Sequence, residues 1–143
     1  MSPVPDGLSG FVTPERDVDT AYFWDGVDAG ELRLRSCTSC GRITAVPVPS
    51  CPFCASTEAH YPVAGGGGKL YSWVICHRAM EETFADDVPY VIADIKLDEG
   101  ARIYGRLIDR AEVELIDGLP VEIVFVQMGP EKIPYWAFRP ARA

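Results

Sequence analysis

Four of the five cysteines in this chain of 143 residues form two Cys-x-x-Cys pairs, Cys37 with Cys40 and Cys51 with Cys54. Each pair can direct two thiolates at one point, and two pairs supply the four sulfur ligands of a tetrahedral metal site. Gly41 permits the left-handed backbone that such a turn often needs. Thiolates favour zinc or iron, and four of them leave no position open for substrate or water. The spacing therefore predicts a structural metal site, and we expect the ion to be Zn²⁺.

Other uses of these four thiols fit the same spacing. They could form two disulfides or stay free, and iron in place of zinc would make the chain an electron carrier. The colour of the purified protein separates the metals, because ferric tetrathiolate is red and zinc is colourless. Cysteines paired for metal, together with an N-terminus that lacks a signal-peptide pattern, lead us to expect a cytoplasmic protein. No run of about eighteen apolar residues is present, so we expect no membrane span.

No other residues form a pattern that predicts catalysis. His77 ends the strand predicted over residues 70–77, and we interpret it as a rim or structural histidine rather than a general base. Cys76 lies within that strand and is more typical of a small buried hydrophobic residue than of a nucleophile. The acidic pairs Glu81–Glu82 and Asp86–Asp87 are typical of a solvated loop, with a divalent-ion site as the alternative.

A helix is predicted over residues 13–29, before the cysteine pairs. Thr13 can cap its start, and Pro14 suits the first helical position. Phe23 and Trp24 fall on one face of this helix. That aromatic face could dock the helix on the body of the protein, or it could contact a partner or a ligand.

The cysteine pairs are predicted to sit on a short β-ribbon. Residues 31–35 alternate strictly, which predicts a strand with two leucines inward and with Arg33 and Arg35 outward. These arginines could serve solubility or could meet an anionic group. A second strand is predicted over residues 43–48. Strand, pair, strand, pair is the layout of a zinc ribbon, whose few residues cannot build a core, so metal ligation must hold it together.

The rest of the chain is predicted to be an OB-type barrel. The glycines at 65–68 are interpreted as a flexible joint, because no Gly-Lys-Ser/Thr pattern of a phosphate-binding loop follows them. Apolar alternation then predicts five strands, over residues 70–77, 90–97, 101–108, 119–126 and 133–138. This strand number, with a bend at Gly105, matches an OB-type barrel.

The formal net charge of −8 argues against binding to nucleic acid, which relies on Lys and Arg to neutralise phosphates. Only the section from 31 to 69 is net basic. Arg102, Tyr104 and Arg106 lie on the outer face of the third predicted barrel strand, as a solvated edge or as a stripe facing an anion or partner. A nucleic-acid binder stays an alternative, because zinc ribbons and OB barrels both occur in such proteins.

Several short motifs are more specific in their order than one by one. In sequence they are Phe23–Trp24, Gly30–Leu34, the two cysteine pairs with Pro47–Ser50 between them, Gly68–Ser72, Pro89–Ala93 and Leu97–Arg102. In this order the chain resembles the acyl-CoA-associated family that joins a rubredoxin-like zinc ribbon to an OB-fold, catalogued as domain of unknown function 35. The resemblance covers about residue 15 to the C-terminus.

Together with this resemblance, the patterns above predict a mainly β protein in three parts. These are an N-terminal arm and helix over residues 1–30, a rubredoxin-like zinc ribbon over 31–63, and a five-stranded OB-fold domain over 64–143. Residues 1–12, with two prolines, two glycines and no periodicity, are interpreted from composition alone as an extended or mobile arm. The resemblance also implies a non-catalytic accessory subunit of a thiolase-like enzyme, a thiolase or aldolase. Such a complex supports C–C bond cleavage or formation on CoA thioesters in lipid or steroid metabolism, with acyl-CoA at the shared interface.

The resemblance assigns only the four cysteines as site residues, and it identifies no catalytic residue in this chain. We hypothesise that Phe23, Trp24, Arg33 and Arg35 contact the partner or CoA. An independent enzyme acting on acyl-CoA is the remaining alternative, and it would need His77, Cys76 or the acidic pairs to converge in space.

Overall fold

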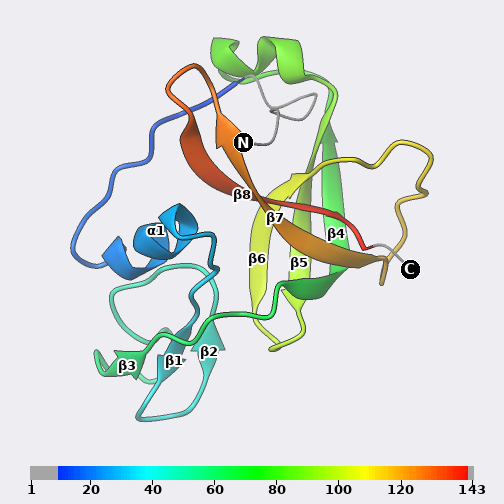
Figure 1. Cartoon of the computed structure of the whole chain (residues 1–143). Helices are drawn as coiled ribbons and strands as arrows, with labels where there is room; N and C mark the ends of the chain where they lie inside the picture. The colour runs from blue at the N-terminus through cyan, green and yellow to red at the C-terminus, as the bar shows by residue number, and fades with distance from the viewer. Residues whose placement is uncertain (1–9, 142–143) are drawn as a thin grey trace.

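Figure 1 shows the computed structural model, which describes residues 10–141 as a short helix, a small ribbon and a closed barrel. The helix lies beside the ribbon and against the barrel strand β8. Within residues 10–141, no helix is long and apolar enough to cross a membrane.

The barrel has five strands in the order β4-β5-β6-β8-β7. Their bounds are β4 Gly67–Cys76, β5 Tyr90–Leu97, β6 Arg102–Leu107, β7 Pro120–Met128 and β8 Ile133–Pro140. Neighbours are antiparallel except β6 and β8, whose parallel pairing closes the barrel. Alternation places Val91, Ala93, Ile95 and Leu97 inside, each at most 2% exposed. The predicted mainly β fold with a five-stranded OB-type barrel is therefore confirmed.

The glycine run before the barrel is not the flexible joint that was predicted. Gly67 and Gly68 begin β4 and pair with β7, and Gly68 also pairs with β5. A Cβ on Gly68 would lie 2.8 Å from the side chain of Ile95 and 2.8 Å from the backbone oxygen of Lys96. Glycine is needed because the strands approach so closely. The prediction failed because these neighbours are distant in the sequence.

The ribbon is a three-stranded antiparallel sheet in the order β2-β1-β3. Its strands are β1 Arg35–Cys37, β2 Ile43–Thr44 and β3 Ala59–His60. β1 is shorter than the strand predicted over 31–35 and begins where that strand was expected to end. β2 covers only the first two residues of the strand predicted over 43–48, and β3 was not predicted. Leu32 and Leu34 are 2% and 1% exposed, which confirms that they point inward.

Helix α1 (Ala21–Asp28) begins well after Thr13, where the start was predicted. A turn occupies the preceding segment instead. The Asp17 carboxylate accepts hydrogen bonds from the backbone N–H groups of Asp19 and Thr20. Short polar side chains offer the backbone such local partners, and these compete with helix formation.

One apolar core joins the helix, the ribbon and the barrel. The ring of Phe23 in α1 stands edge-on to Trp136 in β8, with ring centroids 5.1 Å apart. From the ribbon, Leu32 and Leu34 enter the same cluster as Leu70 of the barrel. The ribbon is therefore held by this shared core in addition to the predicted metal ligation.

The arm predicted over residues 1–12 is in part a fixed segment. Residues 10–12, hereafter the N-terminal strap, are hydrogen-bonded to the 3₁₀ helix η1 (Glu82–Asp87) and to Tyr135 of β8. Residues 1–9 lie outside the described part of the chain.

Because Phe23 is only 1% exposed, we predict that Phe23→Ala lowers the free energy of unfolding by about 3–5 kcal/mol. The loss combines the transfer of the ring to water with a cavity against Trp136. Val18→Ala is the control, since Val18 is 90% exposed and should change stability by less than about 0.5 kcal/mol. Urea unfolding followed by circular dichroism measures both. Equal midpoints for the two variants would contradict a core role for Phe23.

Candidate metal centre

The four predicted metal ligands converge in the ribbon. The Sγ atoms of Cys37, Cys40, Cys51 and Cys54 all lie within 4.8 Å of one another. The Sγ atoms of Cys37 and Cys54 are 3.6 Å apart, and so are those of Cys40 and Cys51. A tetrahedral zinc ion with Zn–S bonds of about 2.3 Å separates its sulfurs by about 3.8 Å. The donor set and its spacing therefore fit Zn²⁺.

Both cysteine pairs sit on the same kind of turn. The N–H of Gly41 donates to the carbonyl oxygen of Cys37 at 2.9 Å, and the N–H of Ala55 donates to that of Cys51 at 2.8 Å. Gly41 and Ala55 are both left-handed, with φ of 78° and 66°. This backbone costs a non-glycine residue about 1–2 kcal/mol, so the second turn reaches the ligand geometry under strain.

Backbone N–H groups also donate to the sulfurs. The N–H of Cys40 donates to Sγ of Cys37 at 3.4 Å, and it is the main reason why the pKa of Cys37 falls to about 6. The N–H of Ser56 lowers the pKa of Cys54, but the hydrogen bond with Cys37, desolvation and the other thiols raise it to about 11. Ionisation of one thiol thus makes ionisation of the neighbouring thiols less favourable, and a bound cation relieves this repulsion between thiolates.

Arg35 is buried next to the metal site, although an outward position was predicted. It is 2% exposed, and its Nη2 donates to the carbonyl oxygen of Ser56 at 2.9 Å. Alternation fails here because β1 is the central strand of the ribbon and residues 34–37 are all buried. Arg35 therefore ties β1 to the loop after the second cysteine pair and offers no surface to a partner.

The other hypothesised contact residues differ in exposure. Phe23 and Trp24 are 1% and 8% exposed, so their rings serve the docking role that was one of two predicted for this helix face. The side chain of Arg33 is 31% exposed, and its Nε lies 3.1 Å from Oε2 of Glu31. Among the four hypothesised residues, Arg33 is the one that is not buried.

The candidate catalytic residues differ in their surroundings. Cys76 ends β4 opposite Tyr90 of β5, and His77 is exposed just beyond it. Asp87 was predicted in a solvated acidic loop, but it is 4% exposed and its Oδ2 lies 3.4 Å from Nη2 of Arg106. The sequence patterns did not predict this ion pair, because η1 and β6 meet only in the tertiary structure. The only hint of it in the sequence was that Arg106 was predicted to point outward from its strand, where it could meet an anionic group.

The three residues predicted on the outer face of β6, Arg102, Tyr104 and Arg106, differ in how far their side chains are exposed. Tyr104 is 61% exposed, and Arg102 lies 4.5 Å above the ring of Tyr71. Nη1 of Arg102 is also 3.5 Å from Oδ2 of Asp94, which balances its charge. Arg106 is the more buried member of the stripe.

Two family profiles match the chain in the order of its structural parts. The profile described as "ChsH2, rubredoxin-like zinc ribbon domain" matches residues 24–59, and "ChsH2, C-terminal OB-fold domain" matches residues 61–126. The chain belongs to the ChsH2 (DUF35) family. A zinc ribbon with four close cysteines and an OB-fold are thereby confirmed, with Zn²⁺ as the cofactor of the ribbon.

Individual relatives support the family assignment. The "3-oxo-4,17-pregnadiene-20-carboxyl-CoA hydratase alpha subunit" of Mycobacterium tuberculosis is 33% identical over 137 residues, which cover 94% of this chain and 43% of that protein. A "DUF35 domain-containing scaffold protein" of Methanocaldococcus jannaschii is 38% identical over 90 residues, 62% of this chain and 63% of that protein. The chain thus spans less than half the length of the mycobacterial subunit.

A solved structure titled "Ltp2-ChsH2(DUF35) aldolase" has the same fold over nearly the whole chain. Its matching chain has a TM-score of 0.78 and 28% sequence identity. The alignment covers 91% of this chain and 100% of that chain.

We predict one zinc ion per chain, because four thiolates at this spacing close a tetrahedral site. Cys40→Ser should lose the ion and the order of the ribbon, since structural zinc contributes on the order of 10 kcal/mol to folding in finger-like peptides. Cys76→Ser is the matched control, because Cys76 is the one cysteine outside the site. Elemental analysis of protein from zinc-replete cells measures the ion, and iron alone or no metal in the wild type would contradict the prediction.

Zinc affinity should fall as the pH falls. The pKa of Cys54 is about 11 without metal, so this thiol carries a proton at neutral pH that zinc must displace. Releasing at least one proton on binding makes the affinity fall at least about tenfold per pH unit between about pH 7 and 9. Competition with a chromophoric chelator at several pH values measures the slope. A flat profile would mean that all four thiols are already ionised.

Proposed function

We propose that the chain is a non-catalytic, zinc-binding accessory subunit of a thiolase-like acyl-CoA complex. In this role it supports C–C bond cleavage or formation on CoA thioesters by a thiolase or aldolase. The observation that carries the proposal is the similarity, over 91% of this chain, to the matching chain of a structure titled as an Ltp2-ChsH2(DUF35) aldolase. That title joins the family name to a second component.

The placement of reactive groups supports an accessory role. One ion would occupy all four ribbon thiolates, which leaves no open position for substrate. Cys76 lies opposite Tyr90 at the end of β4, His77 is exposed just beyond it, and the carboxylate of Asp87 is paired with Arg106. The groups that carry out the reaction would therefore come from the partner, and this chain would complete the assembly.

A second candidate function follows from the mycobacterial relative. That protein is named as a hydratase alpha subunit, and it is 33% identical to this chain over 137 residues. A chain of the same family could therefore assemble with a hydratase acting on an acyl-CoA. Both candidates share the CoA thioester as substrate class and differ in the partner enzyme.

Assembly with an identified partner tests the proposal. We expect the tagged chain, purified from its native host, to retain a thiolase-like protein through gel filtration, with acyl-CoA cleavage only when both chains are present. A hydratase in place of the thiolase-like protein would favour the second candidate. Turnover by the chain alone would overturn both.

Arg33 is the proposed contact to test within this assembly. Arg33→Glu should weaken the complex at least about tenfold, because it reverses a half-exposed charge in the only net basic section. Arg42→Glu is the matched control, since Arg42 is an exposed ribbon arginine outside the hypothesised contact set. Equal losses for both variants would assign the effect to net charge rather than to Arg33.

A further inference from the structure

A pocket of about 240 Å³ lies on the outer face of the barrel and shares no lining residue with the metal site. Strands β5 to β8 form its floor, while Val12 of the N-terminal strap and Phe84 of η1 form its rim. Its main lining residues are Ile92, Gly105, Arg106, Val126, Met128 and Trp136. Sites for small molecules in proteins are typically lined in this way, by apolar and aromatic side chains with few polar groups.

Gly105 lets β6 lie close against β8 at the floor of this pocket. A Cβ at Gly105 would lie 2.9 Å from the ring of Phe138 and 3.2 Å from Nε1 of Trp136, so there is no room for a side chain between β6 and these two rings. Nε1 of Trp136 donates to the carbonyl oxygen of Tyr104 at 2.8 Å, and Phe23 packs against the same indole. The indole is therefore held as a rigid wall.

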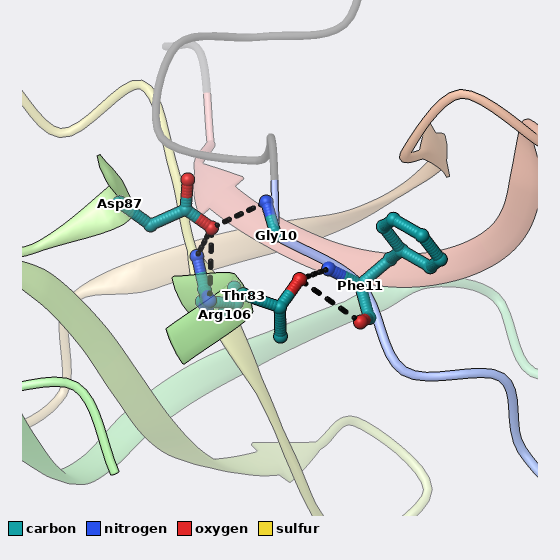
Figure 2. A network of polar contacts seen from close by, with 5 residues as sticks. All are labelled: Gly10, Phe11, Thr83, Asp87 and Arg106. Atoms are coloured by element: carbon teal, nitrogen blue, oxygen red, sulfur yellow. Dashed lines mark hydrogen bonds and ion pairs between the residues drawn. The ribbon is translucent and has the colours of Figure 1, made fainter. Parts of the chain in front are cut away.

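The N-terminal strap is fixed at the rim by the network in Figure 2. The N–H of Gly10 donates to Oδ2 of Asp87 at 3.0 Å, and that oxygen also lies 3.4 Å from Nη2 of Arg106. The N–H of Phe11 donates to Oγ1 of Thr83 at 3.1 Å, and the hydroxyl of Thr83 donates to the oxygen of Phe11 at 3.3 Å. The strap thus closes one side of the pocket as part of the fold.

Two of the polar side chains at the pocket are already engaged. The guanidinium of Arg106 is balanced by Asp87, whose side chain is fully buried, and it lies 3.8 Å above the ring of Tyr90. The hydroxyl of Tyr135 donates to the carbonyl oxygen of Val12 in the strap. A charged ligand would lose its hydration here, and the one charged residue in the lining is already paired, whereas an apolar ligand would gain by leaving water.

We propose that this pocket binds a compact, uncharged apolar group, of the size of a substituted hydrocarbon ring. Cavities of about 150 Å³ with apolar walls bind benzene, so the larger volume here accepts a ring with an alkyl substituent. The proposal stands apart from the proposed function, because the pocket is made entirely by this chain.

Titration of the isolated full-length chain with toluene tests this site, with benzoate as the charged probe. The readout is the ¹H–¹⁵N spectrum. We expect toluene to cause saturable shifts of the Trp136 indole and Gly105 amide signals, while the indole of Trp73, which does not line the pocket, stays in place. Benzoate at the same concentrations should leave all three signals unmoved. The absence of a saturable shift with toluene, or an equal shift with benzoate, would overturn the proposal.

A pair of tryptophan variants locates the binding. Ile92 lines the pocket and is 40% exposed, so Ile92→Trp should fill it and weaken toluene binding at least about tenfold. Val74 lies opposite Ile92 across the strands, is 62% exposed and does not line the pocket. Val74→Trp should therefore bind as the wild type does. If Ile92→Trp folds and binds toluene as the wild type does, the ligand binds elsewhere and the proposal is overturned. If Ile92→Trp does not fold, the titration of the wild type alone decides.

Discussion

The edge-on contact between Phe23 and Trp136 is the interaction on which the arrangement of the three parts depends. Trp136 belongs to the strand that closes the barrel, and its indole is fixed to β6 by the bond to Tyr104. Phe23 belongs to the helix that leads into the ribbon, where Leu32 and Leu34 enter the same core. Loss of this contact would leave Trp24 as the aromatic contact of the helix with Tyr135 and Trp136 of β8, and it would weaken the packing behind the indole of Trp136.

Features with a local signal could be predicted from the sequence. The spacing of Cys37 and Cys40, repeated in the second pair, is set by the geometry of a single turn, so the ligand set followed without knowledge of the fold. The β5 strand Tyr90–Leu97 and its partner β6 were also predicted closely, because one buried face produces a strict alternation. The family resemblance added the order of the parts but no further site residue.

Features that depend on distant neighbours could not be predicted. Arg35 alternates with two leucines as an outward residue would, yet it is buried because strands on both sides make β1 central. The glycine run has the composition of a linker, but Gly68 is required by Ile95 on another strand. Asp87 lies in an acidic stretch, and only the fold brings Arg106 and Gly10 to its carboxylate. In each case the sequence near the residue gives no information on the group that contacts it.

The four ribbon thiols and the carboxylate of Asp87 are held in interactions that neutralise their charge. One divalent ion would balance thiolates that otherwise repel one another, and the buried carboxylate of Asp87 is balanced by Arg106 beside the apolar pocket. Groups held in this way cannot also serve as nucleophile or base without breaking the interactions that stabilise the fold. Under the proposed function, reactivity therefore belongs to the partner. The contribution of this chain is a rigid shape. The metal ion and the shared apolar core fix the ribbon, and the N-terminal strap and the indole of Trp136 fix the walls of the outer pocket.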